Sequence, residues 1–152
     1  MDLRIRKPLK KLRPSRHSVV ALARVLLVDD DPTTRLTLQT VLEAGGYHVD
    51  AAASAAEAIR KMDRKEYELV LSDLHMESPE AGLRVLAHAR LVDYAPAAAL
   101  IHSYHHGRLN PRDRAVLIEP QDLPGLLGQV AELISERATK RLERELRLAS
   151  CV

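Results

Sequence analysis

Cysteine and large aromatic residues are almost missing from this 152-residue chain, which has one cysteine, Cys151, and no tryptophan or phenylalanine. A single cysteine cannot form an intramolecular disulfide, so a reducing, cytoplasmic compartment is expected. Aromatic residues make up 3% of the chain and hydrophobic residues 46%. This balance predicts a core of leucine, valine, isoleucine and alanine, and leaves little material for stacking on nucleic-acid bases.

Long apolar runs are also absent, because no stretch approaches the roughly 18 to 20 apolar residues that a membrane-spanning helix needs. Acidic residues are scarce at the N-terminus, where residues 1–16 hold seven lysines and arginines against one acid, Asp2. The apolar residues 19–23 that follow are too few for the core of a secretory signal. We therefore expect residues 1–23 to form a basic, flexible arm and no membrane association.

From residue 24 onward, short apolar runs alternate with segments of helical periodicity. The apolar runs predict strands over residues 25–28, 47–51, 69–72, 97–101 and 115–118. The periodic segments predict helices over about residues 32–44, 54–64 and 83–91, a short or irregular helix between 102 and 114, and a long helix from 122. This order predicts an α/β fold with a parallel sheet and helices on both of its faces.

The apolar residues of the first and last predicted helices indicate which face of each helix is buried. In the first helix, Leu36, Thr40 or Val41, and Ala44 are expected to be buried. In the last helix an apolar residue recurs every four positions, at Leu126, Val130, Ile134, Ala138, Leu142 and Leu146. This stripe continues past the expected domain boundary at residue 135, so residues 136–152 are predicted to mediate a homodimer or to dock on a partner.

Two of the predicted strands end in carboxylates, with Asp29 and Asp30 after the first strand and Asp73 after the third. Parallel strands end at the same edge of a sheet, so these side chains are expected to meet there. Mg²⁺ prefers oxygen ligands and takes one or two carboxylates from a protein. With the metal bound, Asp73 can act as a nucleophile on phosphorus. Asp31 lies directly before Pro32 and is expected to cap the next helix instead.

The chain from about residue 24 to residue 135 resembles a response-regulator receiver domain. The resemblance is carried by Asp29-Asp30-Asp31-Pro32, Leu71-Ser72-Asp73, Met76, Gly82 and Glu119-Pro120. It implies a flavodoxin-like (βα)5 fold with strand order 2-1-3-4-5. It also implies that Asp73 accepts a phosphoryl group from a histidine kinase or a histidine phosphotransfer protein, and that the backbone carbonyl of His75 joins the carboxylates as a Mg²⁺ ligand.

Several positions depart from the receiver pattern. Glu119 stands where receivers place a lysine that pairs with the phosphoryl oxygens, and Val116 stands at the position of the aromatic switch residue. Ser103 is the expected hydroxyl at the end of the fourth strand, with His102 close to it in register. Glu77 occupies a loop position where proline is common. The acidic half of the site is therefore predicted to be intact, and the positions that sense phosphorylation to be altered.

These observations predict a single-domain receiver that acts by protein contacts and is not an enzyme. Two alternatives stay open: a pseudo-receiver that signals without phosphorylation, and a nucleic-acid-associated regulator that uses the basic arm. A Mg²⁺-dependent phosphohydrolase shares the aspartyl chemistry. It would need a general acid at His75 and a cationic phosphate ligand that the sequence does not place.

Overall fold

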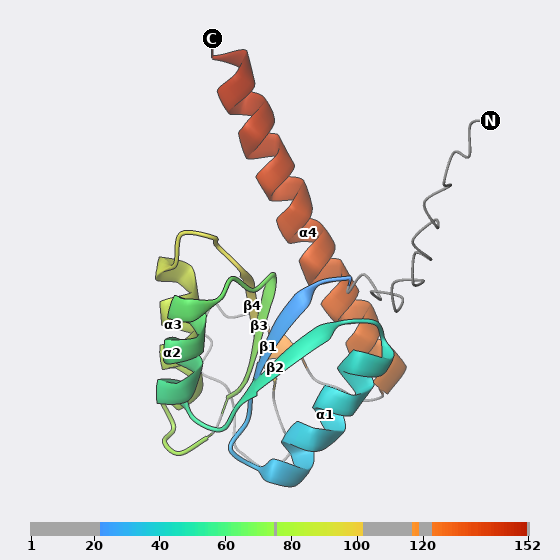
Figure 1. The fold of residues 1–152 in the computed structure, drawn as a ribbon, viewed down its shortest axis with the longest axis vertical. Coiled ribbons are helices and arrows are strands. Elements are labelled where there is room, and N and C mark those ends of the chain that lie inside the picture. The colour runs from blue at the N-terminus through green and yellow to red at the C-terminus, as the bar shows by residue number, and fades with distance from the viewer. Residues whose placement is uncertain (1–21, 75, 102–116, 119–122, 152) are drawn as a thin grey trace, which may run out of the picture.

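The computed structural model describes residues 22–74, 76–101, 117–118 and 123–151 (Figure 1). Strands and helices alternate along these residues. The strands are β1 (Arg24–Val28), β2 (His48–Ala52), β3 (Leu69–Asp73), β4 (Ala97–Ile101) and β5 (Leu117–Ile118). The helices are α1 (Pro32–Ala44), α2 (Ala55–Arg64), α3 (Ala81–Leu91) and α4 (Leu123–Ser150).

The strands form one parallel sheet. Its four full-length strands pair in the order β2-β1-β3-β4, as predicted, and β5 follows β4 through Leu117 and Ile118. Strands that follow one another in the chain are joined by a helix in the described residues: α1 joins β1 to β2, α2 joins β2 to β3, and α3 joins β3 to β4. The predicted short or irregular helix between β4 and β5 lies outside the described residues.

Helices cover both faces of the sheet, which the ribbon shows as three layers (Figure 1). Successive residues of a strand point to opposite faces, so β1 contributes to two separate clusters. Val25 and Leu27 pack with residues of α1 and α4. Leu26 and Val28 pack with residues of α2 and α3. The near-continuous apolar runs of β1 and β3 follow from this burial on both sides.

The predicted buried face of α1 is wrong. Leu38 and Leu42 are buried, whereas Leu36 is 65% exposed. Leu36 and Leu38 are two residues apart, which places them about 200° apart around a helix and so on nearly opposite sides. The sequence has apolar residues on both sides of this helix, and the position of the sheet decides which side is buried.

The predicted Asp31 cap of α1 and the predicted start of α2 near residue 54 are confirmed. The Asp31 side chain accepts a hydrogen bond from the Thr34 N–H at 2.9 Å and caps α1. The Ser54 hydroxyl accepts one from the Glu57 N–H at 3.1 Å and caps α2. The Glu57 carboxylate reaches back to the Ala53 N–H at 2.9 Å, one residue before the cap.

The last helix, α4, packs on the sheet with its first half only and then projects beyond the domain (Figure 1). Leu126 and Val130 are fully buried in the core. Leu142 and Leu146, further along the same stripe, are 56% and 61% exposed. The predicted extension of the apolar stripe past the domain is thus present as an exposed surface. No helix in the described part of the chain has both the length and the apolar character to cross a membrane.

Candidate metal centre

The strand ends bring the predicted carboxylates together. Val28 of β1 pairs in register with Ser72 of β3, so the residues after them, Asp29 and Asp73, lie side by side at the C-terminal edge of the sheet. Asp29, Asp30 and Asp73 each offer a carboxylate oxygen, and these oxygens all lie within 4.8 Å of one another. Asp29 and Asp73 are buried, with 4% and 9% of their surface exposed, whereas Asp30 is exposed. The site is therefore an acidic pocket with one side open to solvent.

The crowding changes the titration of Asp29. Burial, together with the negative charges of Asp73, Asp30 and Asp31, raises its pKa to about 6. A hydrogen bond from the Asp31 N–H to Asp29 Oδ1 at 2.9 Å acts in the opposite direction. The folded chain without metal therefore keeps a proton that the unfolded chain releases between about pH 4 and pH 6. Stability falls as the pH rises through that window, and a divalent cation would offset the loss.

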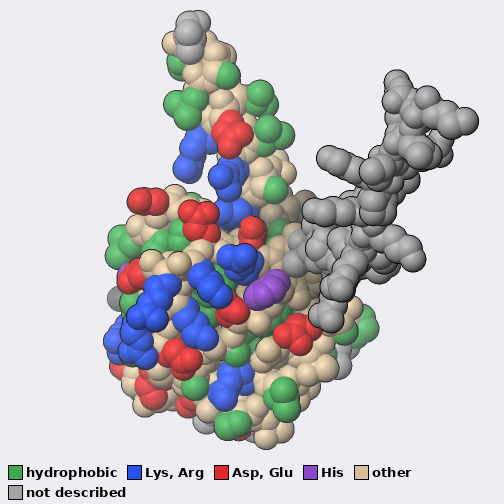
Figure 2. Space-filling model, viewed as in Figure 1, with side chains coloured by type: hydrophobic (Ala, Val, Ile, Leu, Met, Phe, Trp, Pro, Cys, Tyr) green, Lys and Arg blue, Asp and Glu red, His purple; other side chains and the backbone are tan. Residues whose placement is uncertain are grey.

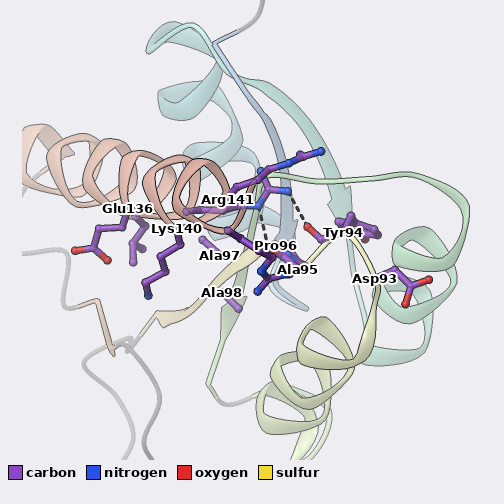
Figure 3. A pocket seen from close by; sticks show the side chains of 12 residues that line it. Asp93, Tyr94, Ala95, Pro96, Ala97, Ala98, Glu136, Lys140 and Arg141 are labelled. Carbon is purple, nitrogen blue, oxygen red and sulfur yellow. Dashed lines mark hydrogen bonds between the residues drawn. The ribbon is translucent and has the colours of Figure 1, made fainter. Parts of the chain in front are cut away.

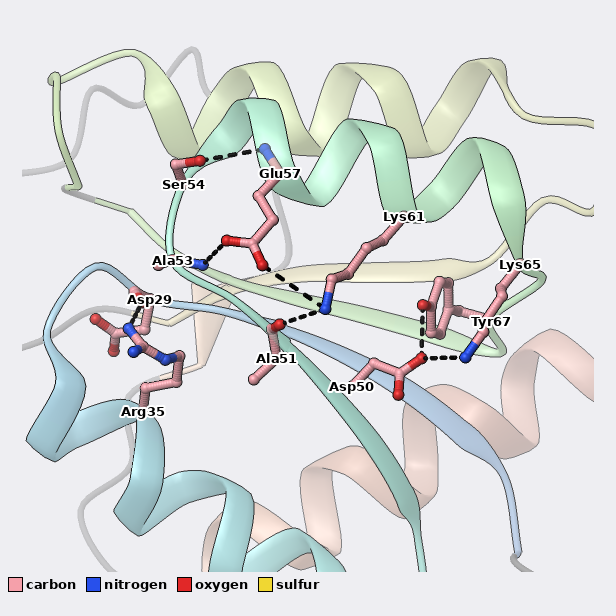
Figure 4. Close-up of polar contacts among 10 residues, drawn as sticks. All are labelled: Asp29, Arg35, Asp50, Ala51, Ala53, Ser54, Glu57, Lys61, Lys65 and Tyr67. Atoms are coloured by element: carbon pink, nitrogen blue, oxygen red, sulfur yellow. Dashed lines mark hydrogen bonds and ion pairs between the residues drawn. The ribbon is translucent and has the colours of Figure 1, made fainter.

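Arg35 of α1 holds the backbone of the same residue. Its Nη1 donates to the Asp29 carbonyl oxygen at 2.7 Å, as Figure 4 shows. The guanidinium thus anchors the turn between β1 and α1 without pairing with the Asp29 carboxylate. Arg35 was not predicted from the sequence. The sequence does not indicate this hydrogen bond, because Arg35 donates to a backbone carbonyl and not to a side chain.

Gly82 allows the start of α3 to approach the end of β3. A Cβ atom at Gly82 would lie 2.5 Å from the Asp73 carbonyl oxygen and 2.8 Å from the Leu74 carbonyl oxygen, closer than real Cβ contacts occur. The Ser72 hydroxyl donates to the Asp73 carbonyl oxygen at 3.0 Å. These contacts fix the backbone that carries the Asp73 carboxylate.

Glu77 ties the loop after Asp73 to the neighbouring helix. Its Oε1 accepts a hydrogen bond from the Ala55 N–H at 2.9 Å, at the first residue of α2. A carboxylate at a helix N-terminus satisfies a free N–H group and is favoured by the helix dipole. In the sequence Glu77 stands out only as a departure from the usual proline. Its contact was missed because the two residues are 22 positions apart.

A second group of polar contacts holds β2 against α2 and the start of β3 (Figure 4). The Tyr67 hydroxyl donates to Asp50 Oδ2 at 2.8 Å, and Lys65 lies 3.5 Å from the same oxygen. The Lys61 ammonium donates to the Ala51 carbonyl at 2.8 Å. Every group in this set has its partner within the set, so these residues support the sheet.

Four positions of the predicted site lie outside the described residues. They are the His75 carbonyl, Ser103, Val116 and Glu119. Their proposed roles, and the choice between Ser103 and His102 as the hydroxyl position, remain predictions. The structure brings together the three carboxylates that the sequence placed at the same sheet edge.

Comparison with known proteins identifies the family. The sequence model of the response regulator receiver domain matches residues 25–108, more than half of the chain, and includes all three carboxylates. The chain therefore belongs to the response regulator receiver domain family. Asp29, Asp30 and Asp73 form the kind of acidic pocket that is typical of a Mg²⁺-binding receiver site.

Relatives of two sizes match the chain. It is 31% identical over 129 residues to the transcriptional regulatory protein GlrR of Escherichia coli, covering 80% of this chain and 28% of GlrR. It is 28% identical over 118 residues to the response regulator receiver protein CpdR of Brucella abortus, covering 74% of this chain and 98% of CpdR. The chain thus spans little more than a quarter of GlrR and nearly all of CpdR.

Solved receiver structures share the fold. The response regulator TrrA of Thermotoga maritima, crystallised in complex with Mg²⁺-BeF, superposes with a TM-score of 0.63 at 29% identity, covering 72% of this chain and 97% of TrrA. A response regulator receiver protein of Sinorhizobium medicae superposes with a TM-score of 0.66 at 25% identity, covering 75% of this chain and 95% of that protein.

Proposed function

We propose that this chain is a response-regulator receiver that accepts a phosphoryl group on Asp73 in a Mg²⁺-dependent histidine-to-aspartate phosphorelay. The observation that carries the proposal is the convergence of Asp29, Asp30 and Asp73 at one sheet edge, with their oxygens within 4.8 Å of one another. The Mg²⁺-BeF complex of TrrA, a relative with the same fold, supports the choice of metal.

The donor set fits Mg²⁺. Carboxylate oxygens are the ligands this cation prefers, and an exposed third acid leaves room for the waters that it retains. Asp29, Asp30 and one oxygen of Asp73 would hold it, together with the predicted His75 carbonyl. Bound there, Mg²⁺ supplies positive charge that neutralises the oxygens of the incoming phosphoryl group.

The chemical step belongs to Asp73. One of its carboxylate oxygens attacks the phosphorus of a phosphohistidine in the donor protein, and a new O–P bond forms as the N–P bond breaks. The electron pair of the broken bond returns to the imidazole nitrogen. Ser72 and Gly82 keep the Asp73 backbone in place for this attack through the contacts described above.

The altered positions bear on the response to phosphorylation. We propose that Glu119, which stands where the family places a lysine, weakens the hold on the phosphoryl group, and that Val116 cannot report its presence by ring rotation. With Ser103 as the only standard residue among these positions, the output differs from that of a typical receiver. The same substitutions favour the alternative, a pseudo-receiver that signals without phosphorylation.

Phosphorylation by a small-molecule donor separates these two functions. With Mg²⁺ present, the wild type is expected to incorporate phosphate, and Asp73→Ala is expected to incorporate none. Equal labelling of both proteins would remove Asp73 from the mechanism. Absence of label on the wild type would favour the pseudo-receiver.

We further propose that the chain acts in the cytoplasm through contacts with other proteins, and that the projecting half of α4 makes one of them with a second copy. A stripe that remains more than half exposed at Leu142 and Leu146 after folding is unusual for a monomer and marks an interaction surface. Residues 1–21 of the basic arm, the predicted nucleic-acid contact, lie outside the described part of the chain.

Sedimentation equilibrium checks self-association. The full chain is expected to be a dimer that dissociates on dilution, and Leu142→Gln/Leu146→Gln is expected to raise the dissociation constant at least tenfold, because each change removes an apolar side chain from the contact. Glu143→Gln/Arg147→Gln keeps the net charge and the apolar stripe and is the matched control. A wild type that is monomeric at every concentration would rule out this dimer.

A further inference from the structure

A cavity of about 340 Å³ lies between α4 and the segment that leads from α3 into β4. It is lined by Asp93 to Ala98 on one side and by α4 residues from Leu133 to Arg144 on the other (Figure 3). These residues precede or begin β4, whereas the carboxylates follow the ends of β1 and β3. The cavity therefore lies at the opposite end of the sheet from the proposed phosphorylation site and belongs to a different site.

One wall of the cavity is strongly basic. Four of its lining residues are Arg137, Lys140, Arg141 and Arg144. Lys140, Arg141 and Arg144 lie three, four and seven positions after Arg137, so all four residues share one face of α4. Lys and Arg side chains gather around the base of the projecting helix in the space-filling view (Figure 2).

Acidic residues do not cancel this charge. The lining contains two acids, Asp93 and Glu136, against four basic residues, which leaves two positive charges in excess. In Figure 3 the carboxylates of Asp93 and Glu136 lie at opposite sides of the view, with the Lys140 ammonium on the same side as Glu136. The excess of positive charge in the lining favours an anion.

Arg137 has a structural role and fixes the wall. Its Nη2 donates to the Tyr94 carbonyl at 2.8 Å and its Nε to the Ala95 carbonyl at 3.0 Å. Ala95 has a φ of +43°, a left-handed conformation that a residue with a side chain adopts rarely and that such bonds help to hold. The two arginine bonds therefore join α4 to the turn before β4 and set the width of the cavity.

Lys140 and Arg144 are the cations available to a ligand. Arg141 lies 3.6 Å from Glu145, whereas Lys140 and Arg144 make no ion pair with any residue that the structure describes. They are one helical turn apart, so their side chains can reach two neighbouring anionic groups. A phosphate or carboxylate gains charge-assisted hydrogen bonds from each.

The floor of the cavity is apolar. It is formed by Pro96, Ala97, Ala98 and Leu133. Ala97 and Ala98 pair with Leu69 and Val70 of β3 in the sheet and also line the cavity. The small alanine side chains at this end of β4 leave the space that a larger residue would fill.

We propose that this cavity binds a small organic anion with two adjacent phosphate groups and an apolar or planar body, a nucleoside diphosphate being the nearest common chemistry. The phosphates would lie against Lys140 and Arg144, and the body against Pro96 and the alanines of β4. The volume is within the range of small-molecule sites, about 300 to 1,000 Å³, and the two cations span a single helical turn. Both features fit a compact ligand better than an extended acidic chain.

Isothermal titration calorimetry of the full chain with ADP tests the site. The buffer contains EDTA, so that no metal ion bridges the nucleotide to the distant carboxylates. The wild type is expected to bind ADP saturably, pyrophosphate more weakly, and adenosine more weakly still. Lys140→Gln/Arg144→Gln is expected to weaken ADP binding at least tenfold, and Lys140→Arg/Arg144→Lys to restore most of it.

The matched control is Arg84→Gln/Arg147→Gln, which removes the same charge from helix positions outside the cavity lining. Its ADP affinity is expected to stay within twofold of wild type. Three results would overturn the proposal: no saturable ADP binding by the wild type, equal losses in the test and control variants, or tighter binding of an oligoglutamate peptide than of ADP. The last would assign the basic wall to an acidic protein segment.

Discussion

Replacing Gly82 by alanine is expected to destabilise the folded chain by about 3 kcal/mol. The new Cβ would lie 2.5 Å and 2.8 Å from two backbone carbonyl oxygens, those of Asp73 and Leu74. Backbone atoms cannot rotate away as the end of a flexible side chain can. Relief requires α3 to move away from β3, which also displaces the Asp73 carboxylate.

Gly128 provides the matched control, because it is also a helical glycine and a Cβ there meets nothing within 4 Å. Gly128→Ala is expected to stabilise the chain by about 0.5 to 1 kcal/mol through lower backbone entropy in the unfolded state. Urea denaturation of both variants measures the two effects. If Gly82→Ala is as stable as wild type, the close approach of α3 to the end of β3 is not a constraint on the fold.

Removing one of the buried acids is expected to abolish the response to Mg²⁺. At pH 7.5, millimolar Mg²⁺ should raise the melting temperature of the wild type by several degrees, since a ligand that binds only the folded state stabilises it. Asp29→Asn should show almost no rise, and should itself be more stable than metal-free wild type at this pH. The amide removes the buried charge whose cost raises the pKa of Asp29 to about 6.

The pH dependence of this response follows from the same carboxylate. Mg²⁺ binds the ionised form of Asp29, so the rise in melting temperature should be much smaller at pH 5, below the pKa of about 6, than at pH 7.5. Asp93→Asn, a change at an exposed acid outside the cluster, should respond to Mg²⁺ as the wild type does. Equal responses at both pH values, or in Asp29→Asn, would contradict a role for Asp29 in holding the metal.

Features encoded by neighbouring residues could be predicted from the sequence. The apolar runs of β1 and β3, the Asp31 cap and the start of α2 near residue 54 depend on residues within a few positions of one another, and each is confirmed. The meeting of Asp29 with Asp73 required one further step, the rule that parallel strands end at the same edge. That step is also confirmed, by the register of β1 with β3.

Features that depend on distant parts of the chain could not be predicted in the same way. The buried side of α1 is chosen by the sheet, which is why Leu36 was assigned to the wrong face. The hydrogen bonds of Glu77 with Ala55, and of Arg137 with the Tyr94 and Ala95 carbonyls, join residues 22 or more positions apart. Backbone donors and acceptors leave no trace in the sequence, so these contacts are visible only in the fold.

Asp73 is central to the proposed function as its phosphoryl acceptor, and one measurement tests this role directly. The intact chain is treated with acetyl phosphate and Mg²⁺, its mass is determined, and the modified position is mapped in its peptides. We predict one phosphoryl group per chain, located on Asp73, and none in EDTA or in Asp73→Ala. An unmodified wild type, or the same mass gain in Asp73→Ala, would contradict the proposed function.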